Sequence, residues 1–489
     1  MSDGGADGDG AGHAQSGAAP SRRRARVVVI GGGVAGLVTA RTLVRGGVDV
    51  VLLESGDELG GKLRPLTVAG ITMDAGAESF ATRGGTVAAL ATELGLADDI
   101  VTPSAAGAWL QPARGRAVPL PKAGLLGIPS IPLARDVIAV VGVAGAIRAQ
   151  LDALLPGQIG AKERSLGALV RKRMGSAVLD LLVAPVATAI HARHPDDLDV
   201  DRVAPTLRDG VRERSSLAHA VLAQREAAPA GSAALGIAGG IHRIADALAA
   251  EVRDRAEVRL RSRVAAILDT SAETTADAAG GTPSSGAVRV ELDDKTSLSA
   301  DYVVAATRLP DSVVPGAPDS APRVAPEATS ITLATLVVDE PALDAAPRGT
   351  GVLVAAGAPG FTAKALTHAT AKWQWLADSA SGRHVVRLSY DGAPRDDEEL
   401  RELARTDAER LLGVSIPQTS VVGFARVAWA GPADAVDSPP VASTPQRIIH
   451  TGERVAGTGL AAVIRHATSQ SESLLKIIAG DAGLRWSER

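Results

Sequence analysis

The fold of this chain is decided at residues 27–36, which read VVVIGGGVAG. Residues 27–30 are β-branched without interruption, a pattern that predicts a parallel strand buried on both faces. The residues after the stretch have helical spacing. In such a strand–turn–helix unit Gly31 permits the tight turn, Gly33 lets the backbone approach a pyrophosphate, and Gly36 lets the helix pack against the strand. The stretch therefore predicts an α/β domain that binds a dinucleotide at the N-terminus of its first helix.

A second strand is predicted over residues 48–53, and Glu54 follows at its end. A carboxylate at this place can accept both hydroxyl hydrogens of an adenosine ribose, and it would repel a 2′-phosphate. Glu54 therefore favours a dinucleotide without that phosphate. Up to this point both NAD and FAD fit the pattern.

The residues after Glu54 distinguish the two cofactors. Five residues separate Glu54 from Gly60, Gly61 and Lys62, and this spacing resembles the FAD-dependent amine oxidase and phytoene desaturase superfamily. A second glycine pair and a cation beside the pyrophosphate suit an extended FAD buried beneath a second turn. NAD dehydrogenases have no need of this turn, so the cofactor is predicted to be FAD.

Composition limits the other possibilities. At 489 residues the chain is long enough for roughly three domains, and a hydrophobic fraction of 46% is ample for their cores. The net charge of -4 gives no overall attraction to nucleic acid. Because the sequence has no cysteine, it offers no disulfide, thiolate nucleophile or covalent thioether link to a flavin. Redox chemistry must therefore come from a bound cofactor.

Four further stretches narrow the resemblance: residues 74–80 (DAGAESF), 120–129 (LPKAGLLGIP), 364–373 (KALTHATAKW) and 457–464 (GTGLAAVI). They resemble the bacterial oxygen-dependent porphyrinogen oxidases, the coproporphyrinogen III and protoporphyrinogen oxidases within the FAD-dependent amine oxidase superfamily. The stretches run in the order of that family and span nearly the whole chain. General amine oxidases lack the second and third of them.

The resemblance implies an α/β fold that combines a Rossmann-like FAD-binding domain with a mixed-sheet substrate domain and a helical subdomain. The FAD-binding domain would be discontinuous, with residues 21–100, 236–310 and 440–489. Residues 101–235 would form the substrate-side region with the helical subdomain, and residues 311–439 the substrate-binding domain. Residues 1–20, rich in Gly, Ala, Ser and Asp, are predicted to be a disordered tail.

The resemblance assigns a non-covalently bound FAD to the glycine turns, the 76–79 stretch and the C-terminal motif. Residues 258–264 are predicted to form one strand, whose last residue, Val264, would hold the adenine through its backbone. The helix after Gly459 would direct its N-terminus at the flavin ring, where negative charge develops on reduction. The predicted cofactor-binding residues are Gly31, Gly32, Gly33, Val34, Ala35, Gly36, Glu54, Ser55, Gly61, Lys62, Gly76, Ala77, Glu78, Ser79, Val264, Thr458, Gly459 and Leu460.

Because the flavin carries the chemistry, no catalytic side chain and no metal are expected. The substrate instead needs cations for its propionates and apolar walls for its macrocycle. His191 and His194 are not predicted to bind a metal, because no third ligand accompanies them and Pro195 ends any helix there. The predicted substrate-binding residues are Arg83, His191, Lys364 and Lys372.

Departures from the family pattern fall on the substrate side. The family shows Gly-Ile-Tyr-Ala where residues 189–192 read AIHA. Trp429 is spaced differently from the following proline than the flavin-side tryptophan of the family, so it is not counted among the predicted site residues.

The predicted function is the FAD-dependent, oxygen-using oxidation of a porphyrinogen to a porphyrin in haem biosynthesis, with the porphyrinogen and dioxygen as partners. Two alternatives remain open: another flavin oxidase or desaturase that acts on an amine or a polyene, and a catalytically silent FAD-binding protein. Coproporphyrinogen III is favoured over protoporphyrinogen IX. The reason is that the composition resembles that of high-GC Gram-positive bacteria, in which similar enzymes act on coproporphyrinogen.

The location is predicted to be the cytoplasm. The arginines of residues 22–26 and the apolar run after them resemble a twin-arginine export signal, but that run contains glycines at nucleotide-binding spacing. The longest other apolar run, residues 137–147, is predicted to be a buried core helix, with peripheral membrane contact as the alternative. It is too short to cross a bilayer of ~30 Å, so no transmembrane segment is expected.

Overall fold

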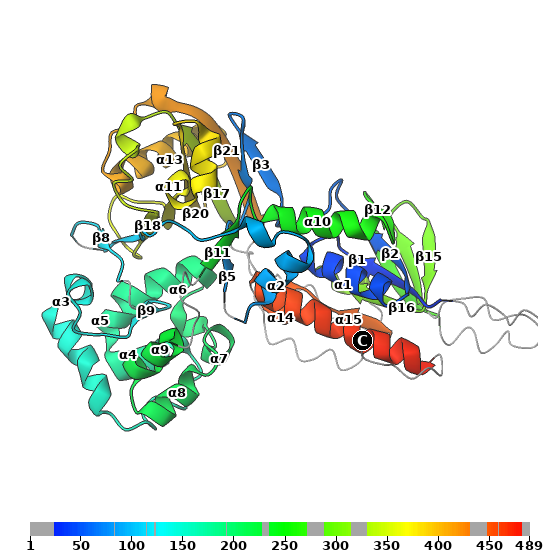
Figure 1. Ribbon diagram of the computed structural model, residues 1–489, viewed down its shortest axis with the longest axis horizontal. Coiled ribbons are helices and arrows are strands. Elements are labelled where there is room, and N and C mark those ends of the chain that lie inside the picture. Colours follow the sequence, from blue (N-terminus) through cyan, green and yellow to red (C-terminus); the bar gives the residue numbers. More distant parts are fainter. Residues whose placement is uncertain are drawn as a thin grey trace, which may run out of the picture.

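The computed structural model describes residues 24–82, 84–113, 115–121, 124–191, 193–226, 234–270, 288–313, 330–430, 447–457 and 459–481. Figure 1 shows three lobes. The parallel-sheet lobe is built on a five-stranded sheet, and the mixed-sheet lobe on a seven-stranded sheet. The helical lobe holds α3 to α9.

The sheet of the parallel-sheet lobe has the strand order β12-β2-β1-β16-β22, and every neighbouring pair is parallel. Its first strand lies in the middle, and Val27, Val28 and Val29 are fully buried there, as predicted. The strands are β1 (Arg26–Ile30), β2 (Asp49–Leu53), β12 (Glu257–Arg259), β16 (Tyr302–Ala305) and β22 (Ile448–His450). The sheet therefore unites strands that are more than 400 residues apart in the sequence.

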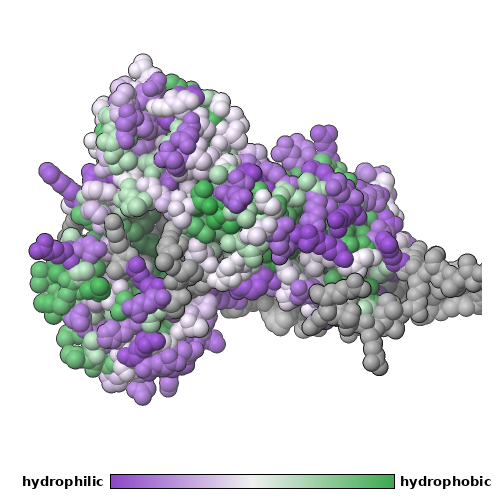
Figure 2. Space-filling model, in the orientation of Figure 1, coloured by the Kyte–Doolittle hydropathy of each residue, from purple (hydrophilic) through white to green (hydrophobic). Residues whose placement is uncertain are grey.

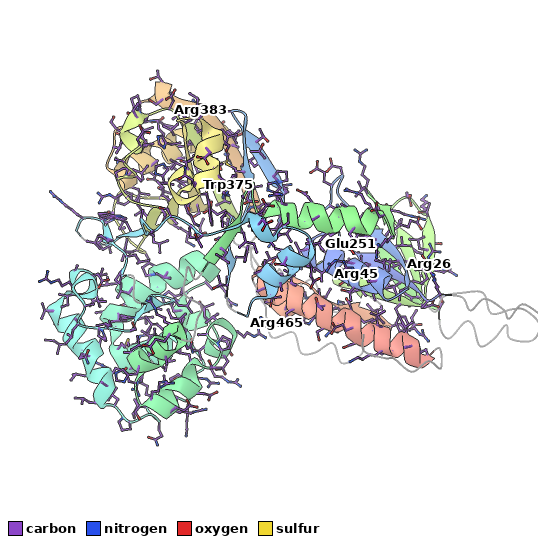
Figure 3. The ribbon with its side chains drawn as sticks, in the orientation of Figure 1. Arg26, Arg45, Glu251, Trp375, Arg383 and Arg465 are labelled. Carbon is purple, nitrogen blue, oxygen red and sulfur yellow. The ribbon has the colours of Figure 1, made fainter. Side chains whose placement is uncertain are left out.

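Three helices cover one face of this sheet: α1 (Val34–Arg45), α10 (His242–Arg253) and α15 (Leu460–Asp481). Leu43 of α1 and Leu475 of α15 belong to the same core. Arg45 and Glu251 form an ion pair of 2.6 Å that links α1 to α10 (Figure 3). The other face packs on a three-stranded antiparallel sheet of β13 (Val264–Asp269), β14 (Val288–Leu292) and β15 (Ser297–Ala300).

The prediction of a single strand over residues 258–264 is wrong. β12 ends at Arg259 in the parallel sheet, and β13 begins at Val264 in the antiparallel one. Between them the chain turns over the end of β2: the N–H of Arg261 donates to the carbonyl of Gly56, and that of Ser262 to the carbonyl of Glu54. These bonds occupy the backbone that a continuous strand would need for its own ladder.

The mixed-sheet lobe has the strand order β21-β17-β20-β19-β18-β7-β8. Helix α13 (Asp397–Leu412) covers one face. The opposite face packs at one end on the hairpin of β3 (Pro65–Val68) and β4 (Ile71–Asp74) and on α11 (Ala369–Lys372) and α12 (Gln374–Ala380). The strands are β7 (Trp109–Gln111), β8 (Val118–Pro119), β17 (Ser330–Val338), β18 (Gly351–Val354), β19 (Ala365–His368), β20 (His384–Asp391) and β21 (Val421–Ala430).

The helical lobe packs around a core that holds one buried ion pair. Arg173 is fully buried, lies 2.5 Å from Asp152, and donates further hydrogen bonds to backbone carbonyls, among them that of Ser215. The helices are α3 (Arg135–Gln150), η2 (Leu151–Leu154), α4 (Leu166–Met174), α5 (Ser176–Val178), α6 (Ala184–His191), α7 (Val200–Val203), α8 (Leu207–Arg214) and α9 (Leu217–Glu226).

The first helix of this lobe differs from its prediction. Val137 and Val141 are buried as expected, but Val143 and Ile147 are 64% and 51% exposed. Because η2 continues the helix, Arg135–Leu154 is long and apolar enough by length and composition to cross a membrane, so the expectation that no segment reaches this length is wrong. The backbone breaks inside it at Gly142, with φ 72 and ψ 168.

Candidate active site

The glycine turn after β1 contains two glycines that the fold itself requires. Gly31 has φ +102, and a Cβ there would lie 2.9 Å from Cβ of Thr307. A Cβ on Gly36 would lie 1.8 Å from the carbonyl oxygen of Gly31. These two positions must therefore be glycine for α1 to pack against the strands, as predicted for Gly36.

Gly33 differs, because none of its neighbours among the described residues requires it to be glycine. Its φ of -74 and ψ of -179 suit any residue, and a Cβ there would meet only Cα of Gly61, at 4.0 Å. As N-cap of α1, Gly33 brings no side chain to the N–H groups of the first turn, which begins with Val34 and Ala35. The turn thus offers free donors and open space, the two features that a pyrophosphate needs.

Glu54 is held in a fixed orientation at the end of β2. One carboxylate oxygen accepts the N–H of Gly32 and the other accepts the N–H of Gly56, each at 2.7 Å. A cavity of about 360 Å³ lies beside it, lined in part by Ser55, Arg261, Ser262, Arg263 and Asp293. Val264 follows directly as the first residue of β13, and its contact with adenine stays a prediction.

The second glycine turn lies on the first. The N–H of Gly60 donates to the carbonyl of Gly32, and a Cβ on Gly61 would lie 3.1 Å from Cα of Gly33. The ammonium of Lys62 lies 2.6 Å from a carboxylate oxygen of Glu453, on α14 (Glu453–Ala456). The C-terminal segment therefore closes over the N-terminal turns. Gly459 and Leu460 follow α14 in this segment, and α15 begins at Leu460.

The loop between β4 and β5 (Phe80–Ala81) connects the cofactor turns to the mixed sheet. The carboxylate of Glu78 lies 2.6 Å from the ammonium of Lys372 and 3.2 Å from the guanidinium of Arg387 on β20. Burial alone would raise the pKa of Glu78, but the two cations outweigh it, so the pKa lies below its usual range. Glu78 is therefore an anion between two lobes.

Two residues of this region were not predicted. Arg387 lies in the middle of a strand, and nothing in its local sequence indicates a partner more than 300 residues earlier. The spacing of Trp429 argues against a place in the site, yet its ring lies 3.4 Å from the position of a Cβ on Gly76, and Arg64 stacks on it at 4.8 Å. The indole N–H of Trp429 is buried and has no partner among the described residues.

The remaining predicted residues are not brought into one place. Lys364 pairs with Asp391 at 2.6 Å, and both side chains are partly exposed. Lys372 is turned to Glu78, as described above. His191 ends α6, and its side chain, like Arg83 and Thr458, lies outside the described residues. The substrate-binding roles of these residues stay predictions.

The two stacked glycine turns, the oriented carboxylate and the mixed-sheet lobe beside them define a dinucleotide-binding α/β protein with a second lobe at its nucleotide site. The chain belongs to the family of flavin-containing amine oxidoreductases, whose model matches residues 34–467. It is therefore an oxidoreductase, and its cofactor is FAD.

Two curated relatives carry the same name. The chain is 30% identical over 204 residues to the coproporphyrinogen III oxidase of Propionibacterium freudenreichii, which covers 42% of this chain and 39% of that protein. It is 29% identical over 475 residues to the coproporphyrinogen III oxidase of Mycobacterium leprae, covering 92% of this chain and 98% of that protein. The crystal structure of a putative protoporphyrinogen oxidase from Exiguobacterium has the same fold, with a TM-score of 0.75, 23% identity, and coverage of 93% and 99%.

Proposed function

We propose that the protein oxidises a porphyrinogen to a porphyrin with FAD and dioxygen, in the cytoplasm, as a step of haem biosynthesis. The observation that carries this proposal is the match along 92% of the chain to a protein named coproporphyrinogen III oxidase. Coproporphyrinogen III is the favoured substrate and protoporphyrinogen IX the less favoured one. The two relatives reported above bear the name of the former reaction.

The chain's own residues supply binding and orientation. A bound FAD would supply the acceptor for hydride from the substrate, with dioxygen as the oxidant that regenerates it. The open space at Gly33 and the donors of α1 fit its pyrophosphate, and Glu54 fits its adenosine ribose. Arg387 of the mixed sheet and Lys372 of α11 hold the loop that carries Glu78 on the opposite side.

The direct test supplies the purified holoprotein with coproporphyrinogen III and, separately, with protoporphyrinogen IX, and follows porphyrin fluorescence. We expect porphyrin from both, with the larger kcat/KM for coproporphyrinogen III. A preference for protoporphyrinogen IX would overturn the choice of substrate. Oxidation of an amine or a polyene, with no porphyrin formed from either porphyrinogen, would overturn the function.

A cation that binds a propionate contributes about 1.5–3 kcal/mol. Replacement of Arg83 by alanine is therefore expected to raise KM for coproporphyrinogen III roughly tenfold or more. The kcat would change little if the contact is equal in the ground and transition states. Unchanged kinetics on both porphyrinogens would remove Arg83 from the site.

We further propose peripheral contact of the helical lobe with a membrane. Figure 2 shows a hydrophobic area on the outer side of this lobe, where Figure 1 draws α3. Four exposed apolar side chains follow one another there at helical spacing: Val143, Ile147, Leu151 and Leu154. An apolar helix face that lies along the surface, on a helix that begins with Arg135, suits the interface of an anionic bilayer.

Flotation with phosphatidylglycerol vesicles tests this contact. We expect the holoprotein to float with the vesicles, and the triple variant Val143→Ser, Ile147→Ser, Leu151→Ser to lose at least about tenfold in the partition coefficient. A matched variant changes three exposed apolar residues elsewhere: Leu268→Ser, Val422→Ser and Ile477→Ser. Equal losses in the two variants, or no flotation of the wild type, would contradict the proposed contact.

A further inference from the structure

Arg387 connects the mixed sheet to the loop that precedes β5. The residue lies on β20 between β17 and β19, and it is only 7% exposed. One guanidinium nitrogen donates to the carbonyl oxygens of Gly76, at 2.8 Å, and of Ala75, at 3.3 Å. A second nitrogen donates to the carboxylate of Glu78 at 3.2 Å. A single side chain thus binds three acceptors of one loop.

Lys372 gives the same loop a second cation. It ends α11, and its ammonium lies 2.6 Å from the other carboxylate oxygen of Glu78. Two cations therefore face one carboxylate, and the group of three carries a net positive charge. Because these side chains are mostly buried, that charge is weakly screened by solvent.

These contacts determine where the donors of the loop point. In a planar trans peptide the N–H lies opposite the carbonyl, so the N–H groups of Gly76 and Ala77 point away from Arg387. Within the described residues, the backbone N–H groups of Gly76, Ala77, Glu78 and Ser79 donate to no backbone carbonyl. Gly76, Glu78 and Ser79 are partly exposed and Ala77 is exposed, so their donors are open to a ligand. Gly76 also lies beside the second glycine turn, because a Cβ on it would lie 3.1 Å from the carbonyl oxygen of Lys62.

We propose that Arg387, assisted by Lys372, is a positioning residue for the flavin. It turns the carbonyl groups of Ala75 and Gly76 toward the mixed sheet, so that the N–H groups of Gly76 and Ala77 face the ring of FAD. Both the aligned donors and the net positive charge favour the reduced flavin, which is the more negative form. The charged group therefore raises the reduction potential of the bound cofactor.

The test measures the reduction potential of bound FAD in the holoprotein, without any porphyrinogen, so its outcome is independent of the proposed substrate. The variant Arg387→Met is expected to shift the ratio of reduced to oxidised FAD at a fixed potential at least tenfold toward the oxidised form. For a two-electron couple this corresponds to about 30 mV. Arg387→Lys keeps the charge but not the three contacts, and a smaller shift in the same direction is expected.

A purely structural role makes a different prediction. Loosening of the loop would weaken the binding of oxidised and reduced FAD by the same factor and leave the potential unchanged. That result for Arg387→Met would overturn the proposal. Where Arg387→Met fails to retain FAD, Lys372→Met decides instead, because it removes one cation and leaves the carbonyl contacts in place. An unchanged potential in Lys372→Met would equally overturn the proposal.

Arg383 supplies a matched control. It precedes β20, and its guanidinium also donates to a backbone carbonyl far away in the sequence, that of Ala69 at 2.9 Å. Figure 3 places it near the outer end of the mixed-sheet lobe, away from α15. Arg383→Met is expected to leave the potential unchanged. A shift equal to that of Arg387→Met would mean that any loosened contact between the lobes has this effect, and the proposal would fail.

Discussion

The parallel-sheet lobe and the mixed-sheet lobe build their parts of the site from different materials. The first offers backbone N–H groups and space, and both depend on glycines such as Gly33. The second contributes buried ionisable side chains, among them Arg387 and His368. Peptide groups do not titrate, whereas side chains do. The first lobe is therefore sensitive to added atoms, and the second to pH and charge.

The largest effects are expected from one methyl group added to the glycine turn. Gly36→Ala brings a Cβ to 1.8 Å from the carbonyl oxygen of Gly31, so unfolding of the apoprotein is expected to become easier by more than about 4 kcal/mol. Gly33→Ala meets no protein atom closer than 4.0 Å, so the apoprotein should keep its stability within about 1 kcal/mol. Its affinity for FAD is nevertheless expected to fall at least about a hundredfold, or 2.8 kcal/mol.

Urea unfolding of the two apoproteins and FAD titration of Gly33→Ala measure these changes. The comparison between the lobes requires that the loss of stability in Gly36→Ala and the loss of FAD affinity in Gly33→Ala occur separately. Full flavin absorbance in Gly33→Ala would mean that the space at this glycine does not belong to the pyrophosphate.

The next effect is a pH dependence of the mixed-sheet lobe. Burial, and then the neighbouring His384, lower the pKa of His368 from 6.5 to about 4. The folded state thus favours the neutral ring of His368. The resulting contribution to the free energy of unfolding is fully present above pH 6.5 and is lost as the pH falls toward 4. The loss is at most about 3 kcal/mol. The fluorescence of Trp373 and Trp375 follows the unfolding of this lobe.

Two leucine variants sharpen the contrast between the lobes. His368→Leu is expected to flatten the pH dependence of the free energy of unfolding between pH 6.5 and pH 4. In the parallel-sheet lobe, burial also lowers the pKa of His450, but we expect His450→Leu to flatten it less, since His368 is the more buried of the two. The contrast would be lost if the His450 variant flattened the curve equally.

The smallest effect is expected at an exposed ion pair of the mixed-sheet lobe. Lys364 and Asp391 lie 2.6 Å apart, but their side chains are 33% and 47% exposed. Lys364→Met is therefore expected to change the free energy of unfolding by less than about 1 kcal/mol, measured in urea. A larger loss would show that solvent exposure does not determine how much an ion pair of this lobe contributes to the free energy of unfolding. Substrate kinetics of the same variant decide separately whether Lys364 binds the porphyrinogen.

The sequence predicted the parallel-sheet lobe because its determinants are local. A buried strand, a glycine turn and an acidic residue after the next strand lie within 30 residues, and β1, β2 and α1 follow that prediction. The β12–β13 break was missed because its cause is a contact between Ser262 and the distant Glu54 backbone. Short-range patterns contain no trace of such a contact.

The charged group at Glu78 could not be predicted for the same reason. Glu78 lies about 300 residues before Lys372 and Arg387 in the sequence, and only the folded chain joins them. Lys372 was identified as important through a resemblance but was assigned to the substrate. The structure instead gives it a carboxylate partner within the protein. Trp429 was set aside on its spacing, a one-dimensional criterion that strand β21 makes irrelevant.

The position of α15 has a consequence for how the protein is made. Its Leu475 packs in the same core as Leu43 of α1. Glu453, which precedes α15 in the sequence, forms an ion pair with Lys62. The nucleotide site thus depends on residues that leave the ribosome more than 400 residues after the glycine turn. At about 5–20 residues per second, translation of this chain takes roughly half a minute or longer. Until α15 has been made, the glycine turn lacks this cover, so the complete nucleotide site can form only after residues 460–481 have left the ribosome.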